Sequence, residues 1–156
     1  MNQQYIVYFV SQTKQNMHKY IENQLKSEGL ENLIPSHGSI LTVLFNSDGP
    51  LTMKEIAEKI GKDKSTVTVL VNHLLYKGFI KKSEKREDRR ITFIELTELG
   101  LSMEEKYRTI SKNVVETAYK EFTEDEKKVF LTLLKKMNTN FKNANADGGS
   151  KDEGDK

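Results

Sequence analysis

Apolar residues recur at helical spacing along most of this chain, and a few breaks divide the pattern into segments. Residues 3–28 carry such a pattern until Gly29 stops it, which predicts a long first helix. A second helix is predicted to begin with Ser36 as its N-cap, and the Asp-Gly-Pro sequence at residues 48–50 ends it. The break at residues 48–50 therefore separates residues 51–97 from the first two predicted helices.

The segment 51–97 predicts two short helices joined by a tight turn. Thr52 and Glu55 have the spacing of a capping box at the start of the first helix, and Gly61 allows the chain to turn. Asp63 is a suitable N-cap for the second helix. The apolar face of that second helix consists of Val67, Leu70, Val71 and Leu74. A helix, a short turn and a second helix with a polar outer face form the helix-turn-helix arrangement.

The polar outer face of the second helix carries side chains that could contact base edges. At about 100° per residue, its outward and flanking positions are Ser65, Thr66, Thr68, Val69, Asn72, His73 and Tyr76. Hydroxyls, an amide and an imidazole can donate or accept hydrogen bonds there, and Val69 can touch a thymine methyl group. On composition alone, a solvated helix face is the simpler interpretation.

The residues after Gly78 favour nucleic-acid binding over a merely solvated helix face. They predict a β-hairpin with a charged tip at residues 84–90, which holds three of the chain's four arginines. Residues 62–91 contain nine lysines and arginines and four acidic residues, a net charge of +5, whereas the whole chain carries only +2. A basic patch confined to one segment is the electrostatic signature of nucleic-acid binding.

Two further helical patterns follow the hairpin. Thr97 is the expected N-cap of a long helix that runs to about Phe122, and Thr123 and Glu126 have capping-box spacing at the start of a last helix. Residues 143–156 are rich in Gly and Asp without an apolar period, which predicts a disordered tail. These helices and the first helix could pack within one chain, but a two-fold DNA site favours a dimer interface.

Composition narrows the possible functions. A chain of 156 residues suits one domain, and the absence of cysteine excludes disulfides, thiolate metal sites and cysteine-based peroxide sensing within this chain. The short apolar run at residues 5–10 lacks the features of a signal peptide, and no stretch reaches the length of a membrane span. We therefore expect a soluble cytoplasmic protein that does not contact a membrane.

The histidines give no support for a metal or catalytic site. His18, His37 and His73 fall in three different predicted helices. His18 and His37 could approach each other if the first two helices pack, but a closed metal site needs about four ligands. Core or surface positions explain these residues better, and His73 has a separate interpretation as a DNA-facing donor. Without a phosphate loop, nucleophile elbow or metalloprotease motif, we expect a non-enzyme with no cofactor and no metal.

Two motifs in order link the chain to a known family. The hairpin tip contains Asp-Arg-Arg at residues 88–90, and Leu-Thr-Glu-Leu-Gly follows at residues 96–100. Together with the helix-turn-helix pattern, they resemble the MarR family of transcriptional regulators over most of the chain, to about Lys142. The resemblance implies an obligate homodimer that binds pseudo-palindromic double-stranded DNA, often with a small-molecule or redox signal that releases it. It also implies that Asp88 orients Arg90 into the minor groove.

We therefore expect a mainly α fold with a small β-wing. The expected parts are an N-terminal dimerisation helix (1–35), a winged helix-turn-helix domain (36–97), C-terminal dimerisation helices (98–142) and the tail (143–156). The expected DNA contacts are Lys64, Ser65, Thr66, Thr68, Val69, Asn72, His73, Lys82, Arg86, Asp88, Arg89 and Arg90. The expected function is a dimeric, sequence-specific transcriptional repressor whose recognition helix enters the major groove and whose wing enters the minor groove.

Two questions stay open at this level. A winged-helix protein-interaction module without sequence-specific DNA binding is the alternative function, although its wing would be expected to be acidic or apolar. An organic effector would lie where the first, second and fifth helices meet. The side chains available there are Phe9, Gln12, Phe45 and Tyr107. Core packing explains these residues equally well, so the sequence assigns no effector pocket and does not distinguish repression from activation.

Overall fold

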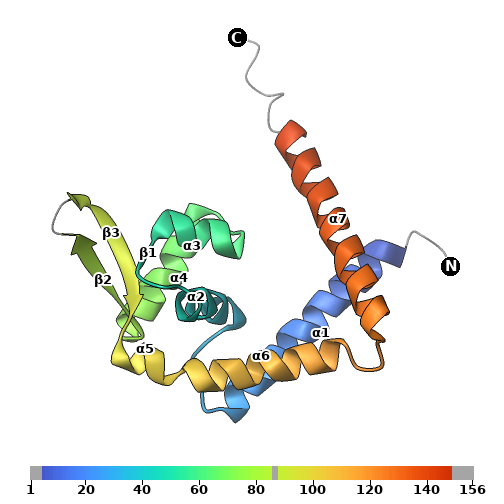
Figure 1. Cartoon of the computed structure of the whole chain (residues 1–156), viewed down its shortest axis with the longest axis horizontal. Coiled ribbons are helices and arrows are strands. Elements are labelled where there is room, and N and C mark those ends of the chain that lie inside the picture. The colour runs from blue at the N-terminus through green and yellow to red at the C-terminus, as the bar shows by residue number, and fades with distance from the viewer. Residues whose placement is uncertain (1–4, 86–87, 149–156) are drawn as a thin grey trace, which may run out of the picture. The chain divides into compact units, whose positions relative to one another are not determined.

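The structure is a computed structural model that describes residues 5–85 and 88–148, with the side chains of 84–90 and 147–148 outside the description. The chain forms two compact units, residues 1–115 and 116–156. In the described part, the first unit contains α1 (Ile6–Ser27), α2 (Pro35–Phe45), β1 (Leu51–Thr52), α3 (Met53–Ile60), α4 (Lys64–Tyr76), β2 (Ile80–Lys85), β3 (Asp88–Leu96), α5 (Glu98–Ser102) and most of α6 (Glu104–Ala118). The second unit contains α7 (Glu124–Gly148). The predicted mainly α fold with a small β-wing is confirmed (Figure 1).

The helix-turn-helix forms where the sequence predicted it, because its ends are specified locally. The Thr52 side chain accepts a hydrogen bond from the Glu55 N–H, and the Glu55 carboxylate accepts one from the Thr52 N–H at 2.7 Å. Gly61 ends α3 with a φ of 65°, a left-handed conformation that glycine adopts at little cost. Asp63 then caps α4. The predicted capping box, turn and second cap are all confirmed.

The three strands form one antiparallel sheet in the order β1-β3-β2. Ile80 pairs with Leu96 and Lys82 pairs with Ile94, while Leu51 of β1 meets Ile94 from the other side. The register shifts between Glu84 and Lys85, next to the hairpin tip. β2 and β3 therefore make the predicted hairpin, and they run side by side at one end of the first unit (Figure 1).

The core of the first unit lies beneath α4 and joins its helices to the sheet. Val67, Val71 and Leu74 of α4 are at most 1% exposed. Fully buried side chains from the other elements complete this core: Leu25, Ile40, Leu41, Ile56 and Ile94. The predicted apolar face of the second helix is therefore confirmed, and it anchors the opposite, polar face in a fixed orientation.

Two helix ends differ from the predictions. The N-cap of α2 is Ile34, not Ser36, because Pro35 occupies the first helical position, where its missing N–H costs nothing. The predicted long helix after Thr97 is instead two helices, α5 and α6, separated at Met103. Thr97 caps only α5, by accepting a hydrogen bond from the Gly100 N–H at 3.1 Å.

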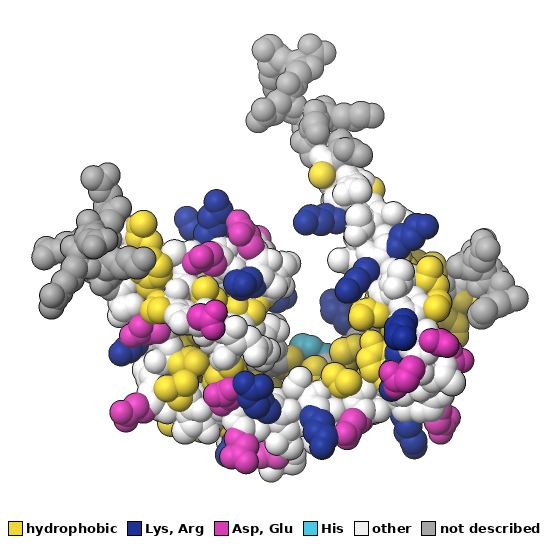
Figure 2. Space-filling view, in the orientation of Figure 1, with side chains coloured by type: hydrophobic (Ala, Val, Ile, Leu, Met, Phe, Trp, Pro, Cys, Tyr) yellow, Lys and Arg dark blue, Asp and Glu magenta, His cyan; other side chains and the backbone are white. Residues whose placement is uncertain are grey.

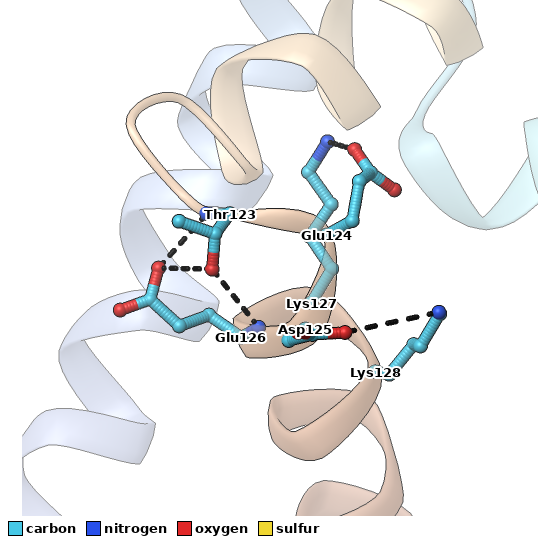
Figure 3. Close-up of polar contacts among 6 residues, drawn as sticks. All are labelled: Thr123, Glu124, Asp125, Glu126, Lys127 and Lys128. Atoms are coloured by element: carbon cyan, nitrogen blue, oxygen red, sulfur yellow. Dashed lines mark hydrogen bonds and ion pairs between the residues drawn. The ribbon is translucent and has the colours of Figure 1, made fainter.

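The last helix starts as predicted and continues further. The Thr123 hydroxyl accepts a hydrogen bond from the Glu126 N–H, and the Glu126 carboxylate accepts one from the Thr123 N–H at 2.8 Å (Figure 3). The bond from the Thr123 N–H, and then one that the Thr123 hydroxyl donates to the same carboxylate at 2.9 Å, lower the pKa of Glu126. α7 runs to Gly148, so residues 143–148 of the predicted tail are helical, and 149–156 lie outside the described residues. Within the described residues, no helix is long and apolar enough to cross a membrane.

Candidate nucleic-acid interface

The start of α4 is held by one carboxylate. Asp63 accepts hydrogen bonds from the Ser65 hydroxyl at 2.5 Å, from the Thr66 N–H at 2.9 Å and from the Thr66 hydroxyl at 2.7 Å. These bonds, that from Ser65 first, hold the pKa of Asp63 well below its usual range. Asp63 therefore stays ionised, and it orients both hydroxyls so that their oxygen lone pairs remain available as acceptors.

The outer face of α4 is open to solvent along its length. Val69 is 69% exposed and Tyr76 is 88% exposed, and Ser65 and Asn72 are also exposed. Such exposure of a branched apolar side chain in the middle of a well-anchored helix suits contact with another molecule. Thr68 lies at the edge of this face, where its hydroxyl donates to the Lys64 carbonyl at 2.8 Å.

His73 is oriented differently from the other predicted contacts on α4. Its ring stacks on that of His37 of α2, with centroids 4.5 Å apart, and its Nδ1 lies 2.8 Å from His37 Nε2. His73 is only partly exposed as a result. His37 thus meets His73, whereas His18 of α1 lies 3.5 Å from the Glu22 carboxylate. No sequence pattern indicated the His37–His73 contact, which joins residues 36 positions apart.

The wing is described in part. Lys82 of β2 is exposed, and its neighbour Lys81 forms an ion pair with Glu95 of β3 at 2.9 Å. Arg86 lies outside the described residues. The backbone of residues 88–90 belongs to β3, but the side chains of Asp88, Arg89 and Arg90 are outside the description. The proposed orientation of Arg90 by Asp88 therefore stays a prediction.

A compact junction connects the wing to the end of α4. The Thr97 hydroxyl donates to the Gly78 carbonyl at 2.6 Å, and the Thr97 N–H donates to the Phe79 carbonyl at 3.1 Å. Gly100 packs so closely here that an added Cβ would lie 2.0 Å from the Phe79 carbonyl oxygen. The Leu-Thr-Glu-Leu-Gly motif thus sets the position of the hairpin against the recognition helix, a role beyond the helix cap predicted for Thr97.

A small cavity lies between α2 and α6 in the same unit. It has a volume of about 200 Å³ and is lined by Thr42, Phe45, Asn46, Tyr107, Arg108 and Ser111. Tyr107 is 7% exposed, and its hydroxyl makes no hydrogen bond within the described part of the chain. Burial raises the pKa of Tyr107, so this hydroxyl stays protonated. The Tyr107 ring fits against α2 because residue 38 is glycine, whose added Cβ would lie 2.8 Å from Tyr107 Cε1.

Metal-ligating side chains do not cluster among the residues that the structure describes. Among residues 5–85 and 88–148, no three His, Asp or Glu side chains are placed to hold one metal ion. The two paired histidines use the facing nitrogens for each other.

Comparison with known proteins identifies the kind of molecule that carries this interface. A family model described as the MarR family matches residues 33–92. The "Uncharacterized HTH-type transcriptional regulator YwhA" of Bacillus subtilis (strain 168) is 29% identical over 124 residues, covering 76% of this chain and 87% of YwhA. The "HTH-type transcriptional repressor YetL" of the same organism is 29% identical over 96 residues, covering 61% of this chain and 58% of YetL.

Solved structures share the same fold. The S. aureus MepR–DNA complex matches with a TM-score of 0.78 and 23% identity, over 86% of this chain and 97% of MepR. A mutant MarR from E. coli in complex with operator DNA matches with a TM-score of 0.73 and 18% identity, over 85% of this chain and 92% of MarR. The family and these relatives are transcriptional regulators, not enzymes. Residues 33–92 thus match the MarR family of transcriptional regulators, and the chain shares the winged helix-turn-helix fold of these solved structures.

Proposed function

We propose that this regulator is a homodimeric repressor that binds a pseudo-palindromic operator through α4 and the wing. The exposed polar face of α4, held by a buried apolar face, is the observation that carries the proposal. MepR and MarR, which share the fold, have structures in complex with DNA. The name of YetL, a transcriptional repressor, favours repression. In this proposal, residues 36–97 form the DNA-reading domain, and residues 1–35 and 98–142 form the dimerisation region.

The contacts with DNA divide by chemistry. Asn72 can make a bidentate contact with adenine, and Val69 can touch a thymine methyl group in the major groove, each worth about 1–3 kcal/mol of discrimination. The other proposed contacts on α4 are Lys64, Ser65, Thr66 and Thr68, with His73 at its edge. On the wing, Arg86, Arg89 and Arg90 with Lys82 neutralise phosphates or enter a narrow A·T-rich minor groove, while Asp88 orients Arg90.

Exposed apolar side chains on the first and last helices support dimerisation. α1 exposes 71% of Val7 and 58% of Phe9, and α7 exposes 58% of Leu133 and 64% of Phe141. Part of this hydrophobic surface is visible in yellow in Figure 2. Large exposed apolar patches mark interaction surfaces. A second copy of the chain is the proposed partner, because a two-fold operator needs two α4 helices at a fixed separation.

The cavity beside Tyr107 supports a small-molecule effector. A buried hydroxyl without a hydrogen-bond partner costs about 1–3 kcal/mol, and a ligand that displaces the packing around Tyr107 and bonds to its hydroxyl would recover that free energy. We propose that a small polar organic molecule binds between Thr42, Asn46 and Tyr107 and changes the affinity for DNA. Cofactors have no part in this proposal.

Selection from a random pool of duplex DNA tests the proposed function. The purified full-length chain is incubated with the pool at near-physiological salt, and the retained duplexes are sequenced. An inverted repeat with half-sites about 10 base pairs apart is the expected result. Retention without a consensus, lost at modest salt, would contradict sequence-specific binding and favour the protein-interaction module, since the basic wing would then act only on phosphates.

A further inference from the structure

Two histidines from different helices meet inside the DNA-reading domain. His37, at the start of α2, is only 3% exposed, and it faces the partly exposed His73 of α4. The two rings are inclined by 29°, and the distance from His37 Nε2 to His73 Nδ1 is 2.8 Å. That distance requires one proton between the two nitrogens, because two facing lone pairs or two facing N–H groups would repel.

The backbone determines which nitrogen supplies that proton. The Ile34 N–H donates to His37 Nδ1 at 3.2 Å, so Nδ1 of His37 holds a lone pair. A neutral imidazole with an unprotonated Nδ1 carries its proton on Nε2. His37 Nε2–H therefore donates to His73 Nδ1, and neutral His73 must in turn carry its own proton on Nε2. The hydrogen-bond network thus assigns both tautomers.

The charge state agrees with this assignment. Burial, and then the charges that His73 and Lys77 carry when protonated, lower the pKa of His37 to about 4. A second proton on His37 would face the Ile34 N–H, and a second proton on His73 would face His37 Nε2–H. At neutral pH the hydrogen-bonded chain from Ile34 through His37 to His73 is therefore complete.

His73, the last residue of this series of hydrogen bonds, lies at the edge of the exposed outer face of α4. At about 100° per residue, His73 lies roughly 80° around the axis of α4 from the outward direction of Ser65. Within the described residues, no hydrogen bond involves Nε2 of His73. A donor at the edge of a recognition helix faces the sugar-phosphate backbone more readily than base edges, and neutral donors make many such contacts.

We propose that His37 is a positioning residue that holds His73 in its Nε2–H form and so presents a fixed hydrogen-bond donor to a DNA phosphate oxygen. This inference rests on the proposed function, because it needs α4 to face DNA. It assigns to the buried end of α2 a role in DNA affinity, although His37 itself touches no DNA. If the pair only packed α2 against α4, the tautomer of His73 would not depend on His37.

The first test reads the tautomers directly. Long-range ¹H–¹⁵N NMR of the ¹⁵N-labelled full-length chain at pH 7.5 distinguishes an Nε2–H imidazole from an Nδ1–H imidazole. We expect Nε2–H for both His37 and His73. An Nδ1–H or protonated His73 overturns the proposal, and this result needs neither DNA nor a variant.

The second test removes the contact while preserving the start of α2. His37→Gln places at the third helical position a side chain that can still accept from the Ile34 N–H, as in a capping box. Its amide can still donate, but from a flexible side chain that lacks the fixed direction of the imidazole Nε2–H, so we expect His73 to become a mixture of tautomers. His18→Gln is the matched control, because His18 is exposed on α1, and it should leave His73 unchanged. A pure Nε2–H form of His73 in His37→Gln overturns the proposal.

The last test connects the tautomer to DNA. Affinity is measured for a duplex selected by the unaltered protein and for an unrelated duplex. We expect His37→Gln to weaken binding to both by a similar factor, about three- to tenfold, with the same salt dependence, because a neutral donor releases no counterion. Equal affinities of His37→Gln and the unaltered protein overturn the inference. If the unaltered protein binds neither duplex, the proposed function itself fails, which is a distinguishable result.

Discussion

Gly100 offers a sharp test of how the wing is joined to the recognition helix. In Gly100→Ala, the new Cβ would lie 2.0 Å from the Phe79 carbonyl oxygen, 3.0 Å from its carbonyl carbon and 3.1 Å from Leu96 Cδ2. The contact with the oxygen involves backbone on both sides, so no side-chain rotation relieves it. The same Phe79 carbonyl accepts the hydrogen bond from the Thr97 N–H, and Thr97 caps α5 through the Gly100 N–H. Any shift of α5 therefore disturbs both bonds.

The expected loss of stability follows from these two effects. Overpacking costs about 1–3 kcal/mol, and loss of an N-cap costs about 1 kcal/mol. Because the backbone positions both the new Cβ and the Phe79 carbonyl oxygen, we expect Gly100→Ala to lower the free energy of unfolding by about 3 kcal/mol. For a chain of this size, that corresponds to a fall in Tm of about 6–12 °C.

The assay is thermal unfolding followed by circular dichroism at one fixed protein concentration, because the Tm of a dimer depends on concentration. Gly49→Ala is the matched control, since a Cβ there would meet nothing within 4 Å and its φ is not in the left-handed region. The control should change the free energy of unfolding by no more than about 0.5 kcal/mol. If Gly100→Ala behaves like Gly49→Ala, the Gly100 contact does not join the wing to α4 as argued.

Three other perturbations have definite expected outcomes. Hydrogen bonds hold the pKa of Asp63 below its usual range, so its stabilisation of α4 is present above a pH of about 4 and is lost as the pH falls below that value. The protection of the α4 amides from hydrogen exchange should therefore fall in that range. Protection that does not fall with pH, or the same pH profile in Asp63→Asn, would contradict this. Tyr107→Phe removes a buried hydroxyl without a partner, so chemical denaturation should find the free energy of unfolding unchanged or raised by up to about 1 kcal/mol, and a clear loss would mean that the hydroxyl is satisfied. Phe141→Asp places a charge on the proposed dimer surface of α7, and sedimentation should detect dissociation to monomers; an unchanged dimer would remove this part of α7 from the interface.

Much of the helix-turn-helix could be predicted because its signals are local. The capping box of Thr52 and Glu55, the turn at Gly61 and the cap at Asp63 depend on residues at most four positions apart. The division of α4 into buried and exposed faces follows from the helical period alone. The motifs at residues 88–90 and 96–100 also indicated the family, because they combine a wing tip with the helix start that follows it.

Some helix boundaries could not be predicted correctly, for a physical reason. Ser36 has the higher preference for an N-cap, but Pro35 fits the first helical position and moves the cap to Ile34. The separation of α5 from α6 at Met103 has no glycine or proline to signal it. It accompanies the close packing of Gly100 on the Phe79 carbonyl, a contact across 21 residues of sequence that no helical period contains.

The helix-turn-helix and the basic composition of the wing could be read from the sequence, since short-range hydrogen bonding, periodicity and charge suffice for these, and the motifs at residues 88–90 and 96–100 indicated the family. The pairs of distant residues that meet depend on tertiary packing: His37 with His73, Tyr107 with Gly38, and Gly100 with Phe79. These contacts depend on how α2, α4 and α6 pack, and a side chain's partners across a packed core are set by the whole arrangement of elements. For this reason His73, predicted at a DNA-facing position beside the outward side chains of α4, also forms the partly exposed end of a series of hydrogen bonds that passes through buried His37.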